Sequence, residues 1–168
     1  MTRHLYLLRH AKSSWDDPSL PDHDRPLAPR GRKAVRRLAT QIEQVGIRPA
    51  LVLCSSATRA RETFDGVAVA LGKPDILVEE RLYAATEDRL LARLRLVEAD
   101  VPSVLVVGHN PGLQELAVLL ARPCDAADRI AKKLPTGALV SLRLDGDWST
   151  VRGQAAELEG LIVPRELS

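Results

Sequence analysis

Short aliphatic runs alternate along this chain with longer segments whose apolar residues recur three or four positions apart. The aliphatic runs predict buried strands, at His4–Leu8, Leu51–Cys54, Ile76–Val78, Val104–Val107 and Leu139–Leu144. Strands that alternate with helices indicate βαβ units, which build a mainly parallel sheet with helices on both faces. We therefore expect an α/β fold, a three-layer α/β/α sandwich, in one domain that covers residues 1–168.

Four segments have helical spacing. They are predicted at Pro29–Val45, at 56–72, at Thr86–Val97 and from Asn110 onward. The fourth opens with Asn110 and Pro111, which are typical of an N-cap followed by the first helical position.

A hairpin is predicted near the end of the chain. Asp145 and Gly146 separate two alternating runs, Leu139–Leu144 and Trp148–Gln154, and Asp-Gly favours a tight turn. The expected sheet is therefore mixed, with this antiparallel hairpin added to a mostly parallel core.

Composition excludes several classes of protein. No apolar run approaches the roughly 18 residues of a membrane span, and the first residues lack the apolar stretch of a signal peptide. The two cysteines, Cys54 and Cys124, share no metal-ligand spacing. A net charge of +2 and an aromatic content of 3% argue against nucleic acid as a partner. We expect a cytoplasmic protein that binds neither membrane nor nucleic acid.

A long polar loop interrupts the alternation directly after the first predicted strand. Residues 11–28 hold several Asp and Pro residues and have no useful periodicity. Loops of this length in compact domains are often functional. This loop also leaves from the carboxyl edge of the sheet, where open α/β folds bind ligands.

Histidines, arginines and a glutamate follow the predicted strands. Arg9 and His10 end the first strand, Arg59 follows the second, Glu80 the third and His109 the fourth. Guanidinium groups match phosphate oxygens, and a histidine among them can act as a nucleophile while a glutamate moves the proton. No P-loop or dinucleotide motif is present. This set predicts phosphoryl transfer without a metal or other cofactor.

Three segments resemble the motifs of the histidine phosphatase superfamily, which includes the phosphoglycerate-mutase-like enzymes. They are Leu8–Ala11 (LRHA), Ser55–Thr63 (SSATRARET) and Val107–Pro111 (VGHNP). The short chain and the segment Asp24–Gly31 (DRPLAPRG) are similar to the SixA-type protein phosphohistidine phosphatases.

The resemblance implies a role for several residues at the strand ends. His10 matches the nucleophile that becomes phosphorylated. Arg9, Arg59 and His109 match residues that bind the phosphoryl group, and Arg25 matches a further phosphate-contacting arginine. Ordinary imidazole chemistry allows His10 to attack in its neutral form, with His109 expected to be protonated.

Glu80 lies where many members of the superfamily place a proton donor, but Glu79 is adjacent, and which of the two reaches the site stays open. Ala11 stands where the family usually has glycine. The resemblance implies removal of phosphate from phosphohistidine on a signalling or phosphotransfer protein. A phosphatase for small phosphorylated metabolites and a non-catalytic phosphate-binding module remain as alternatives.

Overall fold

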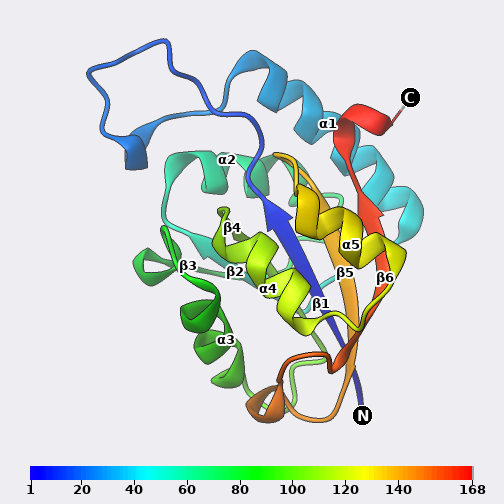
Figure 1. The fold of residues 1–168 in the computed structure, drawn as a ribbon. Coiled ribbons are helices and arrows are strands. Elements are labelled where there is room, and N and C mark those ends of the chain that lie inside the picture. Colours follow the sequence, from blue (N-terminus) through cyan, green and yellow to red (C-terminus); the bar gives the residue numbers. More distant parts are fainter. Residues whose placement is uncertain (168) are drawn as a thin grey trace.

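A computed structural model describes residues 1–167 and contains a six-stranded mixed sheet (Figure 1). The strands are β1 (Thr2–Arg9), β2 (Leu51–Ser55), β3 (Asp75–Glu79), β4 (Ser103–Gly108), β5 (Leu139–Asp145) and β6 (Ala156–Ile162). Their order across the sheet is β3-β2-β4-β1-β5-β6. The first four strands are parallel, whereas β5 and β6 pair antiparallel. The predicted mixed sheet is therefore confirmed.

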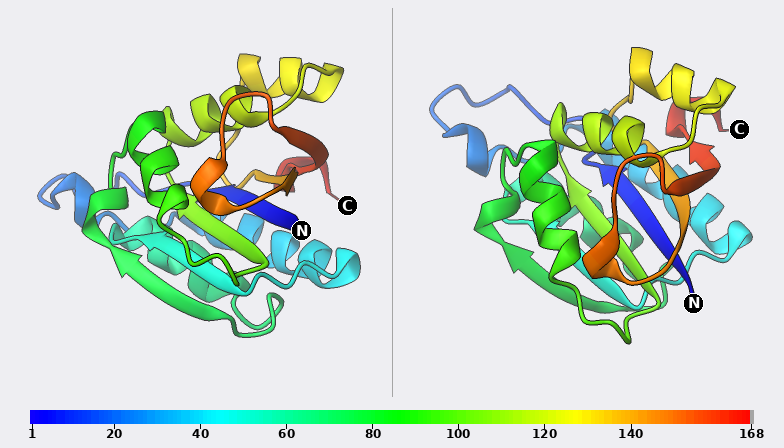
Figure 2. Two further views of the ribbon diagram at one scale, coloured as in Figure 1. Left: turned by 90° about the horizontal axis from the view of Figure 1, so that it is seen from below. Right: turned by 60° about the horizontal axis from the view of Figure 1, so that its bottom comes forward.

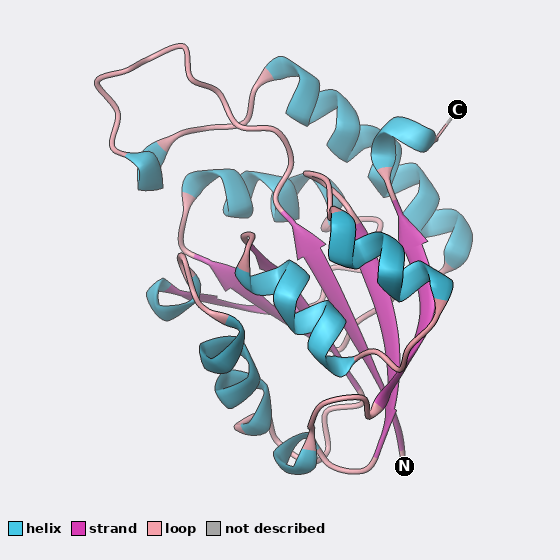
Figure 3. Cartoon of the chain, viewed as in Figure 1, coloured by secondary structure: helices cyan, strands magenta, loops and turns pink. Residues whose placement is uncertain are grey.

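Helices cover both faces of the sheet (Figures 2 and 3). They are α1 (Pro29–Val45), α2 (Thr58–Val67), α3 (Glu87–Arg95), α4 (Gly112–Leu120) and α5 (Asp125–Lys132). Helices α1 and α2 share one apolar core with the sheet, and α3, α4 and α5 share the other. The three-layer α/β/α prediction is confirmed. No helix within residues 1–167 combines the length and apolar character needed to cross a membrane.

Strand β1 shows how local sequence divides the two cores. Successive side chains of a strand point to opposite faces of the sheet. Leu5 and Leu7 accordingly pack into the core under α3, α4 and α5, whereas Leu8 packs under α1 and α2. Helix α1 ends at Gly46, whose positive φ of 83° is a conformation that glycine adopts without steric cost.

Strand β3 differs from its prediction as a buried strand. It lies at the edge of the sheet beside β2, and Ile76, Leu77 and Val78 are 37%, 46% and 50% exposed. A short apolar run predicts a strand but does not distinguish the edge of a sheet from its interior. Which strand takes the edge is decided by the order of pairing, because β4 enters between β1 and β2.

The C-terminal hairpin exists, but its second strand was predicted in the wrong place. Residues Trp148–Thr150 form a 3-10 helix, and Ala156–Ile162 pairs with β5 instead. Trp148 is fully buried, and its indole Nε1 donates to the carbonyl of Val101 at 2.7 Å. Burying this large ring and satisfying its N–H outweighs the alternating pattern that favoured a strand there.

Two helix predictions also need correction. Helix α5 was missed, and its first turn receives a weak cap from the Cys124 sulfur, which accepts from the Ala127 amide at 3.4 Å. Asn110 does not cap α4, because Pro111 is the N-cap residue there. The Asn110 side chain instead donates to the carbonyl of Leu134 at 3.0 Å, a partner distant in sequence.

Candidate active site

The carboxyl ends of β2, β4 and β1 lie side by side and bring Ser55, His109 and His10 together. The amide of His10 donates to the carbonyl of Gly108 at 3.0 Å, which continues the β1–β4 ladder by one residue. The two imidazole rings are 5.1 Å apart between centroids and tilted by 53°. Both histidines are buried, and strand pairing places their backbones side by side.

The hydrogen bonds of His10 define its tautomer. Its Nδ1 lies 2.7 Å from the carbonyl oxygen of Ala11, which can only accept, so Nδ1 carries the proton. Arg59 Nε donates toward His10 Nε2 at 3.4 Å. The lone pair of Nε2 therefore points toward a guanidinium group, as a nucleophile beside an anion site requires.

Arg59 lies in the first turn of α2 and is buried. The Thr63 hydroxyl donates to the Arg59 carbonyl at 2.7 Å and accepts from the Ala11 amide at 3.0 Å. This bridge ties α2 to the segment that follows His10. It keeps the guanidinium of Arg59 close to the ring it contacts.

Asp22 in the long loop joins three side chains of the site, and sequence reasoning missed it. Its carboxylate accepts from Arg59 at 3.0 Å, from Arg25 at 2.8 Å and from the Tyr83 hydroxyl at 2.5 Å. The bond from Tyr83, followed by those from the arginines, lowers the pKa of Asp22 to about 2. Asp22 is therefore an anion at neutral pH and occupies donors that a phosphate could use. Asp22 is one of several Asp residues in a polar loop, and nothing in the sequence distinguishes it from the others.

Arg25 is buried by its own loop. Its guanidinium donates to the carbonyl of Ser14 at 3.0 Å and to the hydroxyl of Ser13. The Arg25 guanidinium carbon also lies 3.3 Å from the centroid of the Trp15 ring. These contacts bring Arg25 next to Asp22 and, through Asp22, next to Arg59.

Ser55 is the partner of His109, and sequence reasoning did not single it out, although it begins the SSATRARET segment. Its Oγ lies 2.8 Å from His109 Nε2 and also accepts from the Ala57 amide at 3.2 Å. His109 Nδ1 is buried and has no hydrogen-bond partner within residues 1–167. His109 is therefore held through Nε2 alone among its ring nitrogens.

Burial lowers the pKa of both histidines, to about 3 for His10 and about 4 for His109. The positive charges of Arg59 and Arg9 add to this effect at each ring. Neutral His10 agrees with the sequence-based expectation. His109 was expected to be protonated, but the structure favours the neutral ring as long as no anion offsets the arginines.

Arg9 acts on the two histidines electrostatically, because its positive charge lowers their pKa values. Its side chain donates to the carbonyl of Leu134 at 2.9 Å, and its Nε is buried without a partner within residues 1–167. Arg9, Arg25 and Arg59 together outweigh the single carboxylate of Asp22. The resulting positive field is suited to a phosphoryl group.

The two glutamates after β3 are held differently. Glu79 forms ion pairs with Arg93 at 2.8 Å and with Arg81 at 2.9 Å, and these bonds lower its pKa. Glu80 lies exposed in a 3-10 turn, and within residues 1–167 its side chain makes no hydrogen bond or ion pair. The structure thus does not join Glu80 to either histidine, and it commits Glu79 to Arg93.

Metal ligands are not gathered here: in the described part of the chain, no group of three or more His, Cys, Asp or Glu side chains could hold a metal ion. The arrangement combines a neutral imidazole nucleophile with guanidinium donors. Chemically, it can bind a phosphoryl group and attack it.

Comparison with known proteins agrees with this arrangement. Residues 5–86 match the family model described as histidine phosphatase superfamily, branch 1. An uncharacterized protein of Mycobacterium tuberculosis is 37% identical over 162 residues, which cover 94% of this chain and all of that protein. This chain belongs to the histidine phosphatase superfamily, and it is a phosphatase.

Two solved structures are similar over nearly the whole chain. A candidate phosphohistidine phosphatase SixA from Nakamurella multipartitia superimposes with a TM-score of 0.86 at 29% identity, covering 98% of this chain and 97% of that one. A candidate SixA from Agrobacterium tumefaciens has a TM-score of 0.81 at 29% identity, covering 96% and 98%. The fold of this chain is therefore SixA-like.

Proposed function

We propose that this protein hydrolyses phosphohistidine on a signalling or phosphotransfer protein through a phosphorylated His10, without a metal. In the first step, His10 Nε2 bonds to phosphorus while the bond from phosphorus to the substrate's imidazole breaks. In the second step, a water oxygen bonds to phosphorus while the bond from phosphorus to His10 Nε2 breaks. This step releases phosphate and restores the neutral ring. Two steps with a good leaving group at each replace one difficult hydrolysis.

The observation that carries the proposal is the tautomer of His10. Because the Ala11 carbonyl holds the proton on Nδ1, the nucleophilic lone pair is on Nε2. Because burial keeps the ring neutral, that lone pair is available throughout the neutral pH range. Both conditions are met before a substrate arrives.

The guanidinium groups would stabilise the transferring phosphoryl group. Charge spreads over its three equatorial oxygens in the transition state, and fixed cations are the main source of stabilisation in such transfers. Arg59 is in direct contact with His10, and Arg9 acts on it through its charge. The phosphoryl group would displace the Asp22 carboxylate from Arg59 and Arg25.

The state of the nearby carboxylates favours a phosphohistidine substrate over a phosphate ester. Asp22 is ionised, Glu79 is paired with Arg93, and Glu80 makes no polar contact within residues 1–167. An alkoxide leaving group would need a well-placed acid, whereas an imidazole can take its proton from water at the other ring nitrogen. The names of the two SixA structures point to the same substrate class.

The first test is to trap the phosphoenzyme. The protein is mixed with a 32P-phosphohistidine protein, denatured in alkali, in which phosphohistidine survives, and then exposed to acid. We expect an acid-labile label on the enzyme itself, resolved from the substrate protein by size, in the wild type. We expect no label on the enzyme in His10→Ala. His4→Ala serves as the matched control, since His4 is half-buried near the start of β1, where it faces Glu159 and contacts no residue of the site. Equal labelling of His10→Ala and the wild type would rule out the mechanism.

The second test defines the substrate. kcat/KM is compared for a phosphohistidine protein, sugar phosphates and nucleotides, each with and without a metal chelator. We expect the phosphohistidine protein to lead the panel and the chelator to have no effect. A strong preference for metabolites would identify a small-molecule phosphatase, and phosphate binding without turnover would identify a binding module.

A further inference from the structure

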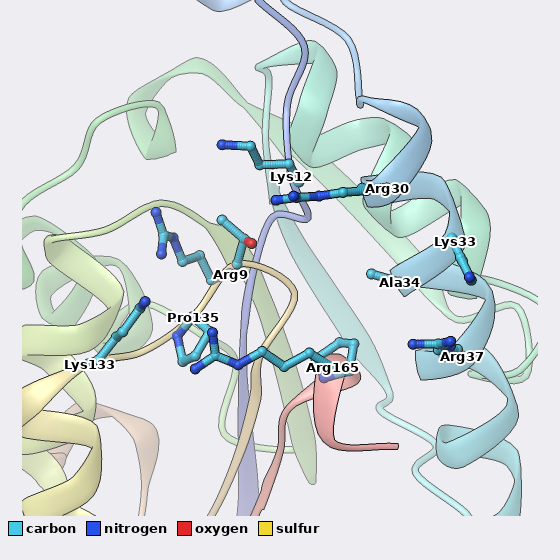
Figure 4. A pocket seen from close by; sticks show the side chains of 11 residues that line it. Arg9, Lys12, Arg30, Lys33, Ala34, Arg37, Lys133, Pro135 and Arg165 are labelled. Carbon is cyan, nitrogen blue, oxygen red and sulfur yellow. The ribbon is translucent and has the colours of Figure 1, made fainter. Parts of the chain in front are cut away.

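A hollow of about 610 Å³ lies beside the active site and is lined mainly by positive charge (Figure 4). We name it the basic hollow, and its cationic side chains are Arg9, Lys12, Arg30, Lys33, Arg37, Lys133 and Arg165. The other lining residues are Ala34, Pro135, Thr136 and Pro164. Among residues 1–167, no carboxylate lines it.

In the described part of the chain, these cations are not paired with carboxylates. Within residues 1–167, no ion pair joins any of the seven side chains to Asp or Glu. The whole chain is nearly balanced, with Lys+Arg 24 against Asp+Glu 22. Gathering so many like charges around one concavity costs free energy through repulsion, and a bound anion removes that cost.

The cations converge on the hollow from different parts of the fold. Arg30, Lys33 and Arg37 project from α1, Lys133 lies on the opposite side, and Arg165 extends toward Pro135 (Figure 4). Side chains that surround a concavity favour a compact ligand that can enter it. A flat protein surface would contact only the rim.

The basic hollow lies beside the cluster of His10, His109 and Arg59, and Arg9, whose charge acts on His10, belongs to its lining. The Gly137 amide donates to the carbonyls of both Arg9 and His10 at 3.0 Å, which joins the 133–136 wall to the catalytic segment. On the other side, α1 packs so closely on this segment that a Cβ at Gly31 would come within 2.1 Å of the Lys12 carbonyl oxygen. His10, His109 and Arg59 do not line the hollow.

The chemistry of the lining defines the ligand class. Arginine presents planar forks of donors that match phosphate oxygens, and the hollow has the volume of a small-molecule site. No aromatic ring lines it, so a nucleobase would find nothing to stack on. We propose that the basic hollow binds a small molecule that carries several phosphoryl groups, recognised through those groups.

The test is isothermal titration with inorganic tripolyphosphate, performed on the wild type and on Arg59→Ala. Because Arg59→Ala disables the pocket around His10, binding that persists in this variant belongs to another site. We expect one tripolyphosphate to bind Arg59→Ala with nearly the wild-type affinity. Loss of binding in Arg59→Ala would place the ligand at His10 and overturn the proposal.

Substitutions on α1 locate the site. We expect Arg37→Gln to weaken tripolyphosphate binding several-fold and Lys33→Gln/Arg37→Gln to weaken it at least tenfold. Arg36→Gln is the matched control, because Arg36 is the exposed neighbour on the same helix and does not line the hollow. Equal affinity in Lys33→Gln/Arg37→Gln and the wild type would overturn the proposal.

Two further measurements separate this inference from other outcomes. A polyglutamate peptide that binds as tightly as tripolyphosphate, with the same sensitivity to Lys33→Gln/Arg37→Gln, would show a docking surface for acidic proteins and overturn the small-molecule proposal. Phosphatase turnover is expected to be unchanged in Lys33→Gln/Arg37→Gln. If the wild type has no turnover but binds tripolyphosphate through α1, the proposed function fails and this inference stands.

Discussion

Arg59 Nε faces His10 Nε2 at 3.4 Å, so the unprotonated ring nitrogen of His10 and the guanidinium group of Arg59 point at each other. The same guanidinium group contacts Asp22 through the carbonyl oxygen at 2.7 Å and the carboxylate at 3.0 Å. One side chain therefore connects the catalytic ring to the long loop.

The first prediction concerns the ionisation of His10. Because burial and nearby cations lower its pKa to about 3, the ring should stay neutral between pH 8 and pH 5. NMR of the 15N-histidine-labelled, unliganded protein should show no titration of His10 in this range, and Nδ1 as the protonated nitrogen. His10→Asn supplies the assignment. A midpoint near the ordinary imidazole value of about 6.5 would contradict the buried neutral state.

The second prediction concerns Arg59. Arg59→Ala removes a cation from the phosphoryl site and should lower kcat roughly 100- to 1,000-fold, as the loss of a fixed donor does in other acyl- or phosphoryl-transfer sites. Arg59→Lys should recover little, because a point charge cannot reproduce the fork that contacts both His10 and Asp22. Steady-state kinetics on a phosphohistidine protein is the measurement.

The matched control for Arg59 is Arg61→Ala. Arg61 lies on the same helix, but its guanidinium is exposed and donates to the Ser56 carbonyl at 3.0 Å. Its removal should leave kcat within about twofold of the wild type, as for most exposed side chains outside a site. Similar losses in both variants would show that α2 contributes only general positive charge.

The third prediction concerns Asp22. Its carboxylate, with a pKa of about 2, occupies donors of Arg59 and Arg25 that a phosphate would use. Asp22→Asn keeps the shape and removes the charge, so inorganic phosphate should inhibit the variant several-fold more strongly than the wild type. Weaker inhibition by phosphate would show that Asp22 positions the arginines rather than competing with the ligand.

The fourth prediction concerns the pH dependence of stability. His10 and His109 have pKa values of about 3 and 4 in the folded chain, and an ordinary imidazole has about 6.5 when unfolded. Below pH 6.5 the unfolded chain therefore binds protons that the folded chain does not. The contribution of these two histidines to the free energy of unfolding should be constant above pH 7. It should fall as the pH is lowered from 6.5 to 4.

Urea denaturation at several pH values measures this effect. His10→Asn removes one of the two groups, so its free energy of unfolding should fall less steeply with acid than that of the wild type. A wild-type stability that rises between pH 6.5 and pH 4 would mean that the histidines are stabilised in their charged form.

The fifth prediction concerns Trp148, which anchors the connection between β5 and β6. Trp148→Ala should lower the free energy of unfolding by about 3–5 kcal/mol, the range for large-to-small changes in a core. Trp148→Phe keeps a ring but leaves the Val101 carbonyl without its indole partner, and should cost about 1–3 kcal/mol. Thermal or urea denaturation measures both. Equal stability of the two variants would show that the hydrogen bond, not the packing, is the main contribution.

The fold class could be predicted because its signals are local. The aliphatic run of β1 and the helical spacing of α1 depend on neighbouring residues, and the bounds of both elements were predicted to within two residues at each end. Trp148 shows the limit of such signals. Its flanking residues alternate like a strand, but its burial against Val101 depends on a contact across 47 positions.

The meeting of His10, Arg59 and His109 was also predictable, because parallel strands place their carboxyl ends on one edge. Neutral His10 was expected as well, but the neutral state of His109 was not. Burial and neighbouring cations, which exist only in the folded chain, make both rings neutral. The roles of His10 and Arg59 are predictions that His10→Ala and Arg59→Ala test, and the roles assigned to His109, Arg9, Arg25 and Glu80 stay predictions.

The sequence by itself determined the order of most strands and helices and the strand ends that carry histidine and arginine. Periodicity and motif spacing depend only on residues that are close together in the sequence. Only the tertiary structure decided that Asp22 contacts Arg59 and Tyr83, that Glu79 pairs with Arg93, and that α1 faces Lys133 and Arg165 across a basic hollow. Each of these depends on the distance between side chains far apart in sequence, and charge interactions are set by that distance and by burial.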